Sequence, residues 1–423
     1  MTVSLLTRLI LASAALSWAA STTNQLDASV ATNEDINEPA HDLSDIELLA
    51  SIKNTQDTEE ADIDEAESVR GKTWWQPTDT TFQIILSKVM LPNPDNSTRK
   101  PPQIEPTFAS VFEVDLFDTP SSTMRAMKRA GRKVICYFSA GTSEDWRPDY
   151  KDFKPADKGK CLAEWAGERY LDVRSPNVWH IMRNRIRLAK RKGCDAIDPD
   201  NVDVANNDNG KNLTQSDAIT FIKKIANEAH RQRMAFGLKN AQDTLVQVIN
   251  MTDFAVNESC AQDGGAEGCA SYANFTKLGR PVYHIEYTNY TTNPSTLELN
   301  LCSSLPLLSN LTSDGIRDHL CLRGYENTIG RGFSTVIKNL GLDEWVLYCD
   351  GRWSKSTVEG KLAVVKARFE CPIATDTGLG LKSPQGEGLC KAPGGNNGTG
   401  GAGGGERRRV KTRRALGWLG GRL

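Results

Sequence analysis

The sequence predicts an α/β fold in which parallel strands alternate with helices and close into a barrel. Three observations support this prediction. Strand-like and helix-like segments alternate between residues 72 and 352, the candidate strands number eight, and polar residues gather where most of these strands end. A doubly wound open sheet is the alternative that such alternation leaves open.

The candidate strands are short runs rich in β-branched and aromatic residues, as buried parallel strands usually are. They cover residues 81–86, 112–117, 134–138, 194–197, 234–239, 254–257, 282–287 and 333–337. One further candidate strand, 169–173, lies in the long interval between the third and the fourth of them.

Helical patterns fill several of the intervals. Residues 177–192 place Val178, Met182 and Ile186 on one face. Residues 214–233 open with Thr214 followed three positions later by Asp217, which resembles a capping box with Asp where Glu is usual. Both helices connect consecutive candidate strands, as neighbouring parallel strands require.

The amino terminus has the pattern of a secretory signal. Residues 1–20 contain Arg8 followed by an apolar run that is too short to span a bilayer, and no later stretch is long and apolar enough. We therefore expect a secreted, extracellular protein with no membrane partner. Eight N-x-S/T sequons fit this route, and the ten cysteines are expected to be paired. Cys260–Cys269 is the best local pair and Cys302–Cys321 the second, with the other pairings undetermined.

The flanking segments differ from the barrel in composition. Residues 21–71 hold about fourteen acidic residues and no aromatic residue, which predicts a disordered acidic leader. Residues 353–390 are assigned to an appendage, and 391–423 form a glycine-rich and then basic tail. Behind a signal peptide, this tail indicates a flexible cationic segment, so we expect no nucleic-acid partner. We also expect the protein to be a monomer.

Polar residues follow the strands in a consistent position. Three carboxylates, Asp198, Asp200 and Asp203, fall within six residues after the fourth strand, and Glu258 ends the sixth. Because the carboxyl ends of barrel strands meet at one face, these carboxylates are expected to converge on one site. Paired carboxylates are the groups that acid/base hydrolysis needs, so Asp200 and Glu258 are the predicted catalytic residues.

Substrate contacts are expected from the other polar residues at these strand ends. They are Asp115, Asp118, Asp198, Asn201, Asp203, Lys239, Asn240, Glu286 and Tyr287. Structural roles compete for four of them: Asp198 as a turn-forming residue before Pro199, Asp203 as a helix cap, Lys239 as a barrel ion pair, and Asp115 as a structural partner.

Other chemistries lack their motifs. No zinc spacing, nucleophile elbow, phosphate loop or dinucleotide fingerprint is present, and the stretch beginning at Asp198 lacks the oxygen ligand and glycine of a calcium loop. No cofactor and no metal are therefore expected, with a magnesium site at Asp198, Asp200 and Asp203 as the alternative.

Nine short motifs, taken in order, resemble glycoside hydrolase family 114 over about residues 74–350. They are WQP at 75–77, VDLFD at 114–118, VICYFSAG at 134–141, EDWRPD at 144–149, ERYLDVR at 168–174, PDNVD at 199–203, GLKN at 237–240, VNESC at 256–260 and IEY at 285–287. Two departures are Ala196, where many members have Gly, and Ser259, where Gln is common.

The resemblance implies a (β/α)8 barrel of the TIM type with endo-α-1,4-polygalactosaminidase activity. The substrate would be a cationic, galactosamine-containing polysaccharide, and the family's proposed catalytic pair maps onto Asp200 and Glu258. We expect Asp200 to act as nucleophile or base and Glu258 as general acid. A separation of about 5 Å between the carboxyls would mean retention, and about 6.5–9.5 Å inversion. The alternatives are a non-catalytic glycan-binding barrel and a glycosidase for another wall polymer.

Overall fold

The computed structural model describes residues 74–78, 81–92, 102–162, 165, 167–290, 299–301 and 312–361. The predicted signal peptide, acidic leader and glycine-rich basic tail lie outside these residues. Within them, no helix has the length and apolar character needed to cross a membrane.

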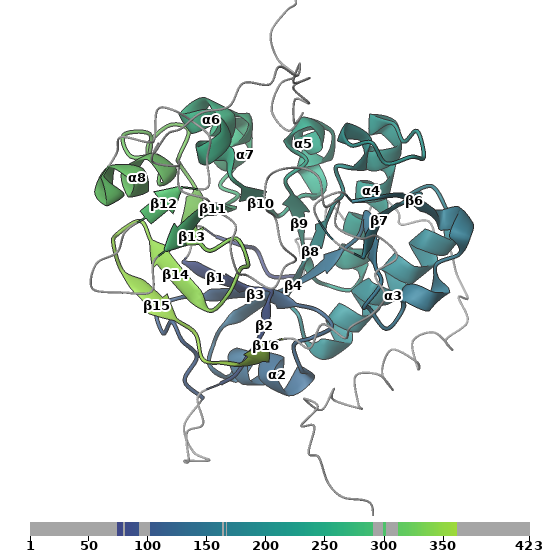
Figure 1. Cartoon of the computed structure of the whole chain (residues 1–423), viewed down its shortest axis with the longest axis horizontal. Coiled ribbons are helices and arrows are strands. Elements are labelled where there is room, and N and C mark those ends of the chain that lie inside the picture. Colours follow the sequence, from purple (N-terminus) through teal and green to yellow (C-terminus); the bar gives the residue numbers. More distant parts are fainter. Residues whose placement is uncertain are drawn as a thin grey trace, which may run out of the picture. The chain divides into compact units, whose positions relative to one another are not determined.

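Eight parallel strands form the central part of the main sheet in the described chain (Figure 1). They are β1 (Phe82–Ile85), β3 (Val111–Asp115), β4 (Lys133–Ser139), β8 (Ala196–Asp200), β9 (Ala235–Lys239), β10 (Phe254–Glu258), β11 (Val282–Tyr290) and β13 (Phe333–Lys338). They pair in this order, and every pair is parallel. Because the order never reverses, the doubly wound alternative is excluded.

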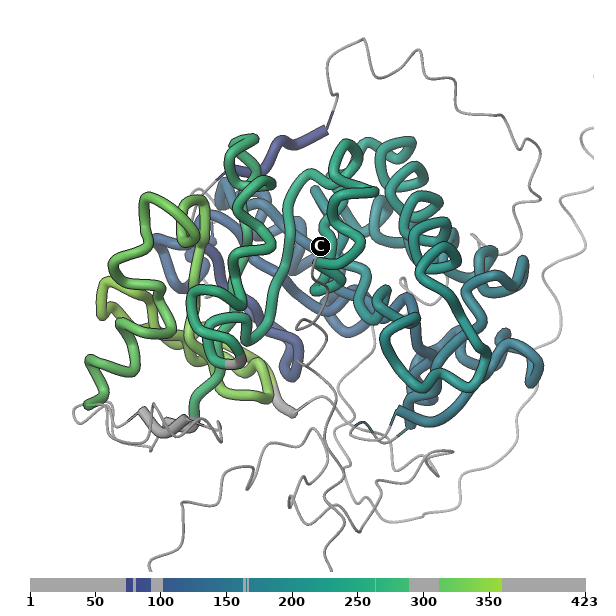
Figure 2. The backbone as a smooth tube through the Cα atoms, turned by 90° about the horizontal axis from the view of Figure 1, so that it is seen from above, coloured from purple at the N-terminus to yellow at the C-terminus, as the bar shows by residue number. Residues whose placement is uncertain are grey.

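Side-chain contacts join the first of these strands to the last one and to the segment that follows it. Lys338 Nζ donates to Gln83 Oε1 at 2.9 Å, and the hydroxyl of Tyr348 donates to the carbonyl of Phe82 at 3.1 Å. In Figures 1 and 2 the purple β1 strand accordingly lies beside the yellow-green strands near the C-terminal end of the described chain. The predicted barrel of eight strands is confirmed.

Helices on the outside of the sheet connect the strands. They are α2 (Ser121–Arg129), α3 (Pro176–Lys192), α4 (Gln215–Arg231), α5 (Leu245–Val248), α6 (Cys260–Cys269), α7 (Ala273–Lys277) and α8 (Ser313–Leu320). The two helices predicted from periodicity correspond to α3 and α4. The capping box is also present: Asp217 N donates to Thr214 Oγ1 at 3.2 Å, and Thr214 N donates to Asp217 Oδ2 at 2.8 Å.

Alternation along the strands separates two buried layers. One set of apolar side chains fills the barrel interior, and the other packs between the sheet and the helices. Inward positions become polar toward the carboxyl ends of the strands. On β8 the inward series runs Ala196, Asp198, Asp200, and on β9 the small Ala235 precedes Lys239 by four positions. The polar end of the interior is therefore the candidate site.

Shorter strands flank the eight parallel strands. β5 (Thr142–Glu144), β6 (Lys158–Cys161) and β7 (Glu168–Leu171) form an antiparallel sheet, in which β7 corresponds to the extra strand predicted at 169–173. β12 (Leu299–Leu301) pairs with β11, and β14 (Trp345–Tyr348) pairs with β13.

The region assigned to an appendage begins inside the sheet rather than after it. β15 (Trp353–Lys355) pairs with β14, and β16 (Val358–Lys361) pairs with β2 (Lys88–Met90). The boundary expected at residue 352 therefore cuts through a run of paired strands. Two strands of three and four residues are too short for alternation to reveal them in the sequence.

The disulfides match the sequence prediction in one case and correct it in another. Cys260–Cys269 is present as predicted. The predicted Cys302–Cys321 pair is wrong, because Cys321 follows α8 and lies beside the end of β14, where it bonds to Cys349 with a Cα–Cα distance of 5.7 Å. A third bridge, Cys136–Cys194, joins β4 to the segment before β8.

Candidate active site

Lys239 lies at the centre of the polar end of the barrel. Its side chain is 1% exposed, and its Nζ is 3.6 Å from Asp198 Oδ2, 3.8 Å from Asp200 Oδ2 and 3.7 Å from Glu258 Oε2. Burial opposes the charge on this lysine, but the surrounding carboxylates raise its pKa well above its usual range. Lys239 is therefore a fixed cation shared by three carboxylates.

Asp200 and Glu258 are the two of these carboxylates that solvent reaches. Their side chains are 20% and 25% exposed, whereas Asp198 is fully buried. The two predicted catalytic residues therefore occupy the accessible surface of the cluster, and Asp198 lies beneath them.

The carboxylate of Asp200 is held by a tyrosine and by the backbone of an asparagine. The hydroxyl of Tyr137 donates to Asp200 Oδ2 at 3.0 Å, and the backbone N–H of Asn201 donates to Asp200 Oδ1 at 2.7 Å. Burial, and then the charge of Asp200, raise the pKa of Tyr137 well above its usual range. The phenol therefore remains a donor.

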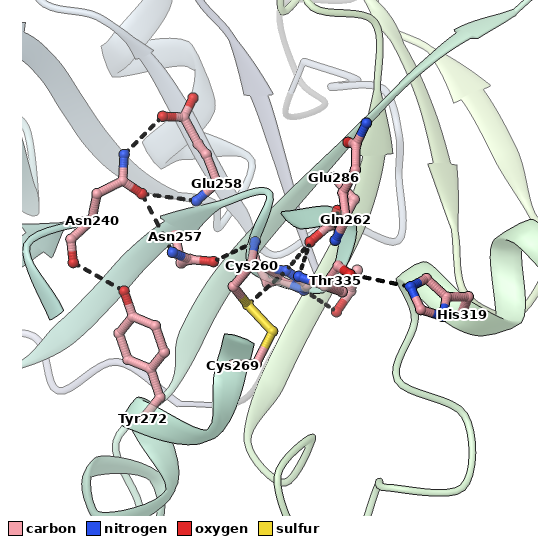
Figure 3. The surroundings of a disulfide bond; sticks show 12 residues. Asn240, Asn257, Glu258, Cys260, Gln262, Cys269, Tyr272, Glu286, His319 and Thr335 are labelled. Carbon is pink, nitrogen blue, oxygen red and sulfur yellow. Dashed lines mark hydrogen bonds and ion pairs between the residues drawn. A yellow bond between two sulfur atoms is a disulfide. The ribbon is translucent and has the colours of Figure 1, made fainter. Parts of the chain in front are cut away.

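The carboxylate of Glu258 has a matching pair of partners. The hydroxyl of Tyr287 donates to Glu258 Oε1 at 2.5 Å, and Asn240 Nδ2 donates to Glu258 Oε2 at 3.0 Å. Asn240 also accepts the backbone N–H of Glu258, at 2.9 Å (Figure 3). Burial, and then the charge of Glu258, raise the pKa of Tyr287 in the same way. Both candidate catalytic groups are thus oriented by one tyrosine, one asparagine and Lys239.

The backbone turns sharply after each of these strands. Asn201, Asn240 and Ser259 have φ values of 57°, 50° and 63°, in the left-handed region that asparagine tolerates better than most residues. A Cβ on Gly141 would lie 1.7 Å from the carbonyl oxygen of Asn201, so only glycine allows these two loops to meet. These turns lead the chain away from the strand ends, while the carboxylates of Asp200 and Glu258 remain at the ends of β8 and β10.

Two of the predicted substrate contacts are occupied by an internal ion pair. Arg147 donates to both oxygens of Asp115 at 2.9 and 2.6 Å, to Asp118 at 2.9 Å and to Glu144 at 2.9 and 2.8 Å. Burial raises the pKa of Asp115, but Arg147 outweighs it and the pKa is lowered. Burial and the neighbouring Asp115 charge raise the pKa of Asp118 to about 7. We name this set the Arg147 cluster.

Glu286 is fully buried and binds backbone groups, unlike the accessible Asp200 and Glu258. Its buried carboxylate accepts the backbone N–H groups of Ala261 and Gln262 at 2.7 and 3.0 Å, and Oε1 lies 2.6 Å from His284 Nε2 (Figure 3). It thereby fixes the first turn of α6, the helix that begins two residues after Glu258. Asp203 immediately precedes a short 3-10 helix, Val204–Asn206, but its side chain makes no capping hydrogen bond to that helix.

Three residues of this region are absent from the predicted site: Glu113, Tyr137 and Arg147. The first two could have been inferred from the sequence. Glu113 lies two positions before Asp115 on β3, and Tyr137 lies two positions before Ser139, the polar residue that ends β4. Such spacing places them on the same inward face of their strands. Arg147 gives no such signal, since it follows β5 in a loop and reaches the barrel only through tertiary contacts.

One group in the described part of the chain has three potential metal ligands close together: Cys260, Cys269 and His284. Its two sulfur atoms are joined in the disulfide, so they are not available as thiolates. Asp198, Asp200 and Asp203 do not form such a group among the described residues. The magnesium alternative therefore gains no support from the geometry.

A barrel that presents two solvent-accessible carboxylates at the carboxyl ends of its strands has the arrangement of a retaining or inverting glycoside hydrolase. In agreement with this arrangement, the model of glycoside-hydrolase family GH114 matches residues 64–354. The chain belongs to this family and is a glycoside hydrolase.

Two solved structures are similar to this chain. The chain is 42% identical to Aspergillus fumigatus Ega3, solved in complex with galactosamine, with a TM-score of 0.53 over 65% of this chain and 97% of that one. The glycoside hydrolase domain of PelA from Pseudomonas aeruginosa is 11% identical, with a TM-score of 0.42 over 62% of this chain and 95% of that one. No curated protein gave a match.

Proposed function

We propose that this chain is a secreted endo-glycosidase that hydrolyses α-1,4-galactosaminidic bonds in a galactosamine-rich polysaccharide. Asp200 serves as nucleophile or base, and Glu258 as general acid. The observation that carries the proposal is the pair of accessible carboxylates, each held by a tyrosine and an asparagine, on either side of Lys239. The 42% identity to a protein solved with galactosamine supports the choice of sugar.

The charge of the site suits this substrate. A polymer with free amines is cationic near neutral pH, and three carboxylates surround Lys239 at the polar end of the barrel. The disulfides Cys136–Cys194, Cys260–Cys269 and Cys321–Cys349 suit an oxidising, extracellular compartment.

The test is hydrolysis of α-1,4-linked galactosamine oligomers, followed by mass spectrometry of the products. Fully N-acetylated oligomers of the same linkage measure the need for the amine. β-1,4-linked glucosamine oligomers measure the combined need for the α-linkage and for the galacto configuration at C4. We expect internal cleavage of the free-amine α-linked oligomers alone. Cleavage of another polymer instead would reassign the substrate, and binding without cleavage of any would favour a glycan-binding barrel.

Variants identify the catalytic pair. Asp200→Asn and Glu258→Gln keep the size of each side chain and remove its acid/base chemistry, so both should abolish cleavage while the circular-dichroism spectrum stays unchanged. Asp208→Asn and Glu326→Gln are matched controls, because their side chains are 81% and 52% exposed and pair with surface residues. The anomer first released, read by NMR, decides between retention and inversion.

A further inference from the structure

Beneath the accessible carboxylates lies a pair of buried carboxyl groups, Glu113 on β3 and Asp198 on β8. Both residues are 0% exposed, and the two carboxyls lie within hydrogen-bonding reach of each other. No N–H or hydroxyl group of the described residues donates to any of their four oxygens. Lys239 Nζ, at 3.6 Å from Asp198, is beyond hydrogen-bonding distance.

Two ionised carboxylates in this position would be buried side by side with no donor. Such an arrangement is costly, and a proton held between them removes one charge and supplies the missing donor. Burial, and then the charge of Asp198, raise the pKa of Glu113 well above its usual range. Burial also raises the pKa of Asp198, to about 6, but Lys239 opposes the shift. The proton therefore belongs on Glu113, and Asp198 keeps the charge that faces Lys239.

The groups around the pair come from several strands. Lys239 faces it from β9, Glu258 from β10 and Tyr287 from β11, while Asp200 follows Asp198 on β8. Only Lys239 among them is cationic. Its attraction is divided among three carboxylates, so a fourth full charge at Glu113 would draw the ammonium group away from Asp200 and Glu258.

We propose that Glu113 and Asp198 hold one shared proton at neutral pH, and that Glu113 is thereby a positioning residue for the carboxylates above it. The protonated Glu113 donates to Asp198, which holds this carboxylate in place as the buried anionic partner of Lys239. The ammonium group then stays almost equidistant from Asp198, Asp200 and Glu258. The consequence for catalysis rests on the proposed function, whereas the shared proton does not.

Infrared spectroscopy of the full-length protein tests the proton directly. The C=O stretch of a protonated carboxylic acid is separate from that of a carboxylate, so the difference between wild type and Glu113→Gln at neutral pH should show the loss of one protonated-acid band. Glu168→Gln is the matched control, because Glu168 is another buried carboxyl whose pKa burial raises. It should remove a different band. A difference spectrum for Glu113→Gln that lacks the protonated-acid band overturns the proposal.

Kinetics test the positioning role. Glu113→Met removes the donor and leaves the charge of Asp198 without a hydrogen bond, so kcat should fall tenfold to about a hundredfold with a smaller change in KM. Glu113→Gln supplies an amide N–H to Asp198 and should restore most of the lost kcat. Equal losses in both variants would show that a merely structural role is enough. If the methionine variant does not fold, the pH profile of kcat for Glu113→Gln tests the proposal instead. If Glu113 is a neutral acid, its replacement by Gln leaves the pH profile unchanged. If Glu113 is ionised, the loss of its negative charge shifts the profile and overturns the proposal.

Discussion

Lys239 and Arg147 each hold three carboxylates around one buried cation, yet the two clusters differ in geometry. Arg147 makes five hydrogen bonds of 2.6–2.9 Å to Asp115, Asp118 and Glu144. Lys239 lies 3.6–3.8 Å from each of its three carboxylates. A planar guanidinium saturates its partners, whereas an ammonium group at these distances leaves carboxylate oxygens for other donors and for substrate.

Exposure follows the same division. The carboxylates of the Arg147 cluster are 3–16% exposed, and two of the three around Lys239 are 20–25% exposed. Carboxylates at strand ends are therefore not equivalent, because the nearby cation decides which are structural and which are available for chemistry. Substitutions in the two clusters should therefore affect different quantities.

The largest effect is expected at the accessible carboxylates. Asp200→Asn and Glu258→Gln should each lower kcat by about 10³-fold or more, because each removes a group that acts on the reacting atoms. The midpoint of thermal unfolding should change little. Near-normal turnover in either variant, measured as new reducing ends, would contradict the assignment of that residue.

At Arg147 the effect should appear in stability instead. Arg147→Met leaves three carboxylates buried around an apolar side chain, so the free energy of unfolding should fall by about 3–5 kcal/mol. Arg147→Lys should recover only part of the loss, since an ammonium group cannot reproduce five hydrogen bonds. Urea denaturation of both variants measures the difference. A variant that keeps full stability and loses only turnover would assign the Arg147 cluster to catalysis and break the comparison.

The Arg147 cluster should also make stability depend on pH. The folded pKa of Asp118 is about 7, above its ordinary value, so the folded state holds a proton that the unfolded state has lost between about pH 4 and 7. The stabilisation that the protonated Asp118 contributes is complete below about pH 4. It is lost as the pH rises from 4 to 7, by at most about 1.4 kcal/mol per pH unit. Asp115, whose pKa is lowered, acts in the opposite sense and only below about pH 4.

Denaturation curves of wild type and Asp118→Asn at several pH values isolate this dependence. The variant should lose the part of the slope between pH 4 and 7 that belongs to Asp118, while other buried carboxyls contribute equally to both proteins. Identical slopes in the two proteins would show that Asp118 is ionised throughout.

The smallest effect is expected at the surface. Lys160 and Asp208 form an ion pair at 2.6 Å, but their side chains are 59% and 81% exposed. Asp208→Asn should change the free energy of unfolding by less than about 1 kcal/mol and leave turnover intact, because solvent and salt screen such pairs. A larger loss, measured by urea denaturation, would mean that exposure is a poor guide to the two buried clusters as well.

Much of the fold was predictable because it depends on local patterns. Each of the eight barrel strands was located within a few residues, and helices α3 and α4 follow from their apolar faces and from the capping box at Thr214. The strands at 353–361 could not be predicted, since a three-residue strand is too short to show an alternating pattern. The Cys321–Cys349 bridge could not be predicted either, since a disulfide depends on which segments meet in space.

The sequence by itself determined that carboxylates gather at the ends of strands, because alternation and the order of a parallel barrel place those ends on one face. Tertiary structure decided what each carboxylate does. Arg147 reaches Asp115 across 32 positions of sequence, and Lys239 reaches Asp200 across 39, so neither partner is visible in the residues around the carboxylate. Protonation and exposure are set by these distant cations and by burial, which a linear pattern does not contain.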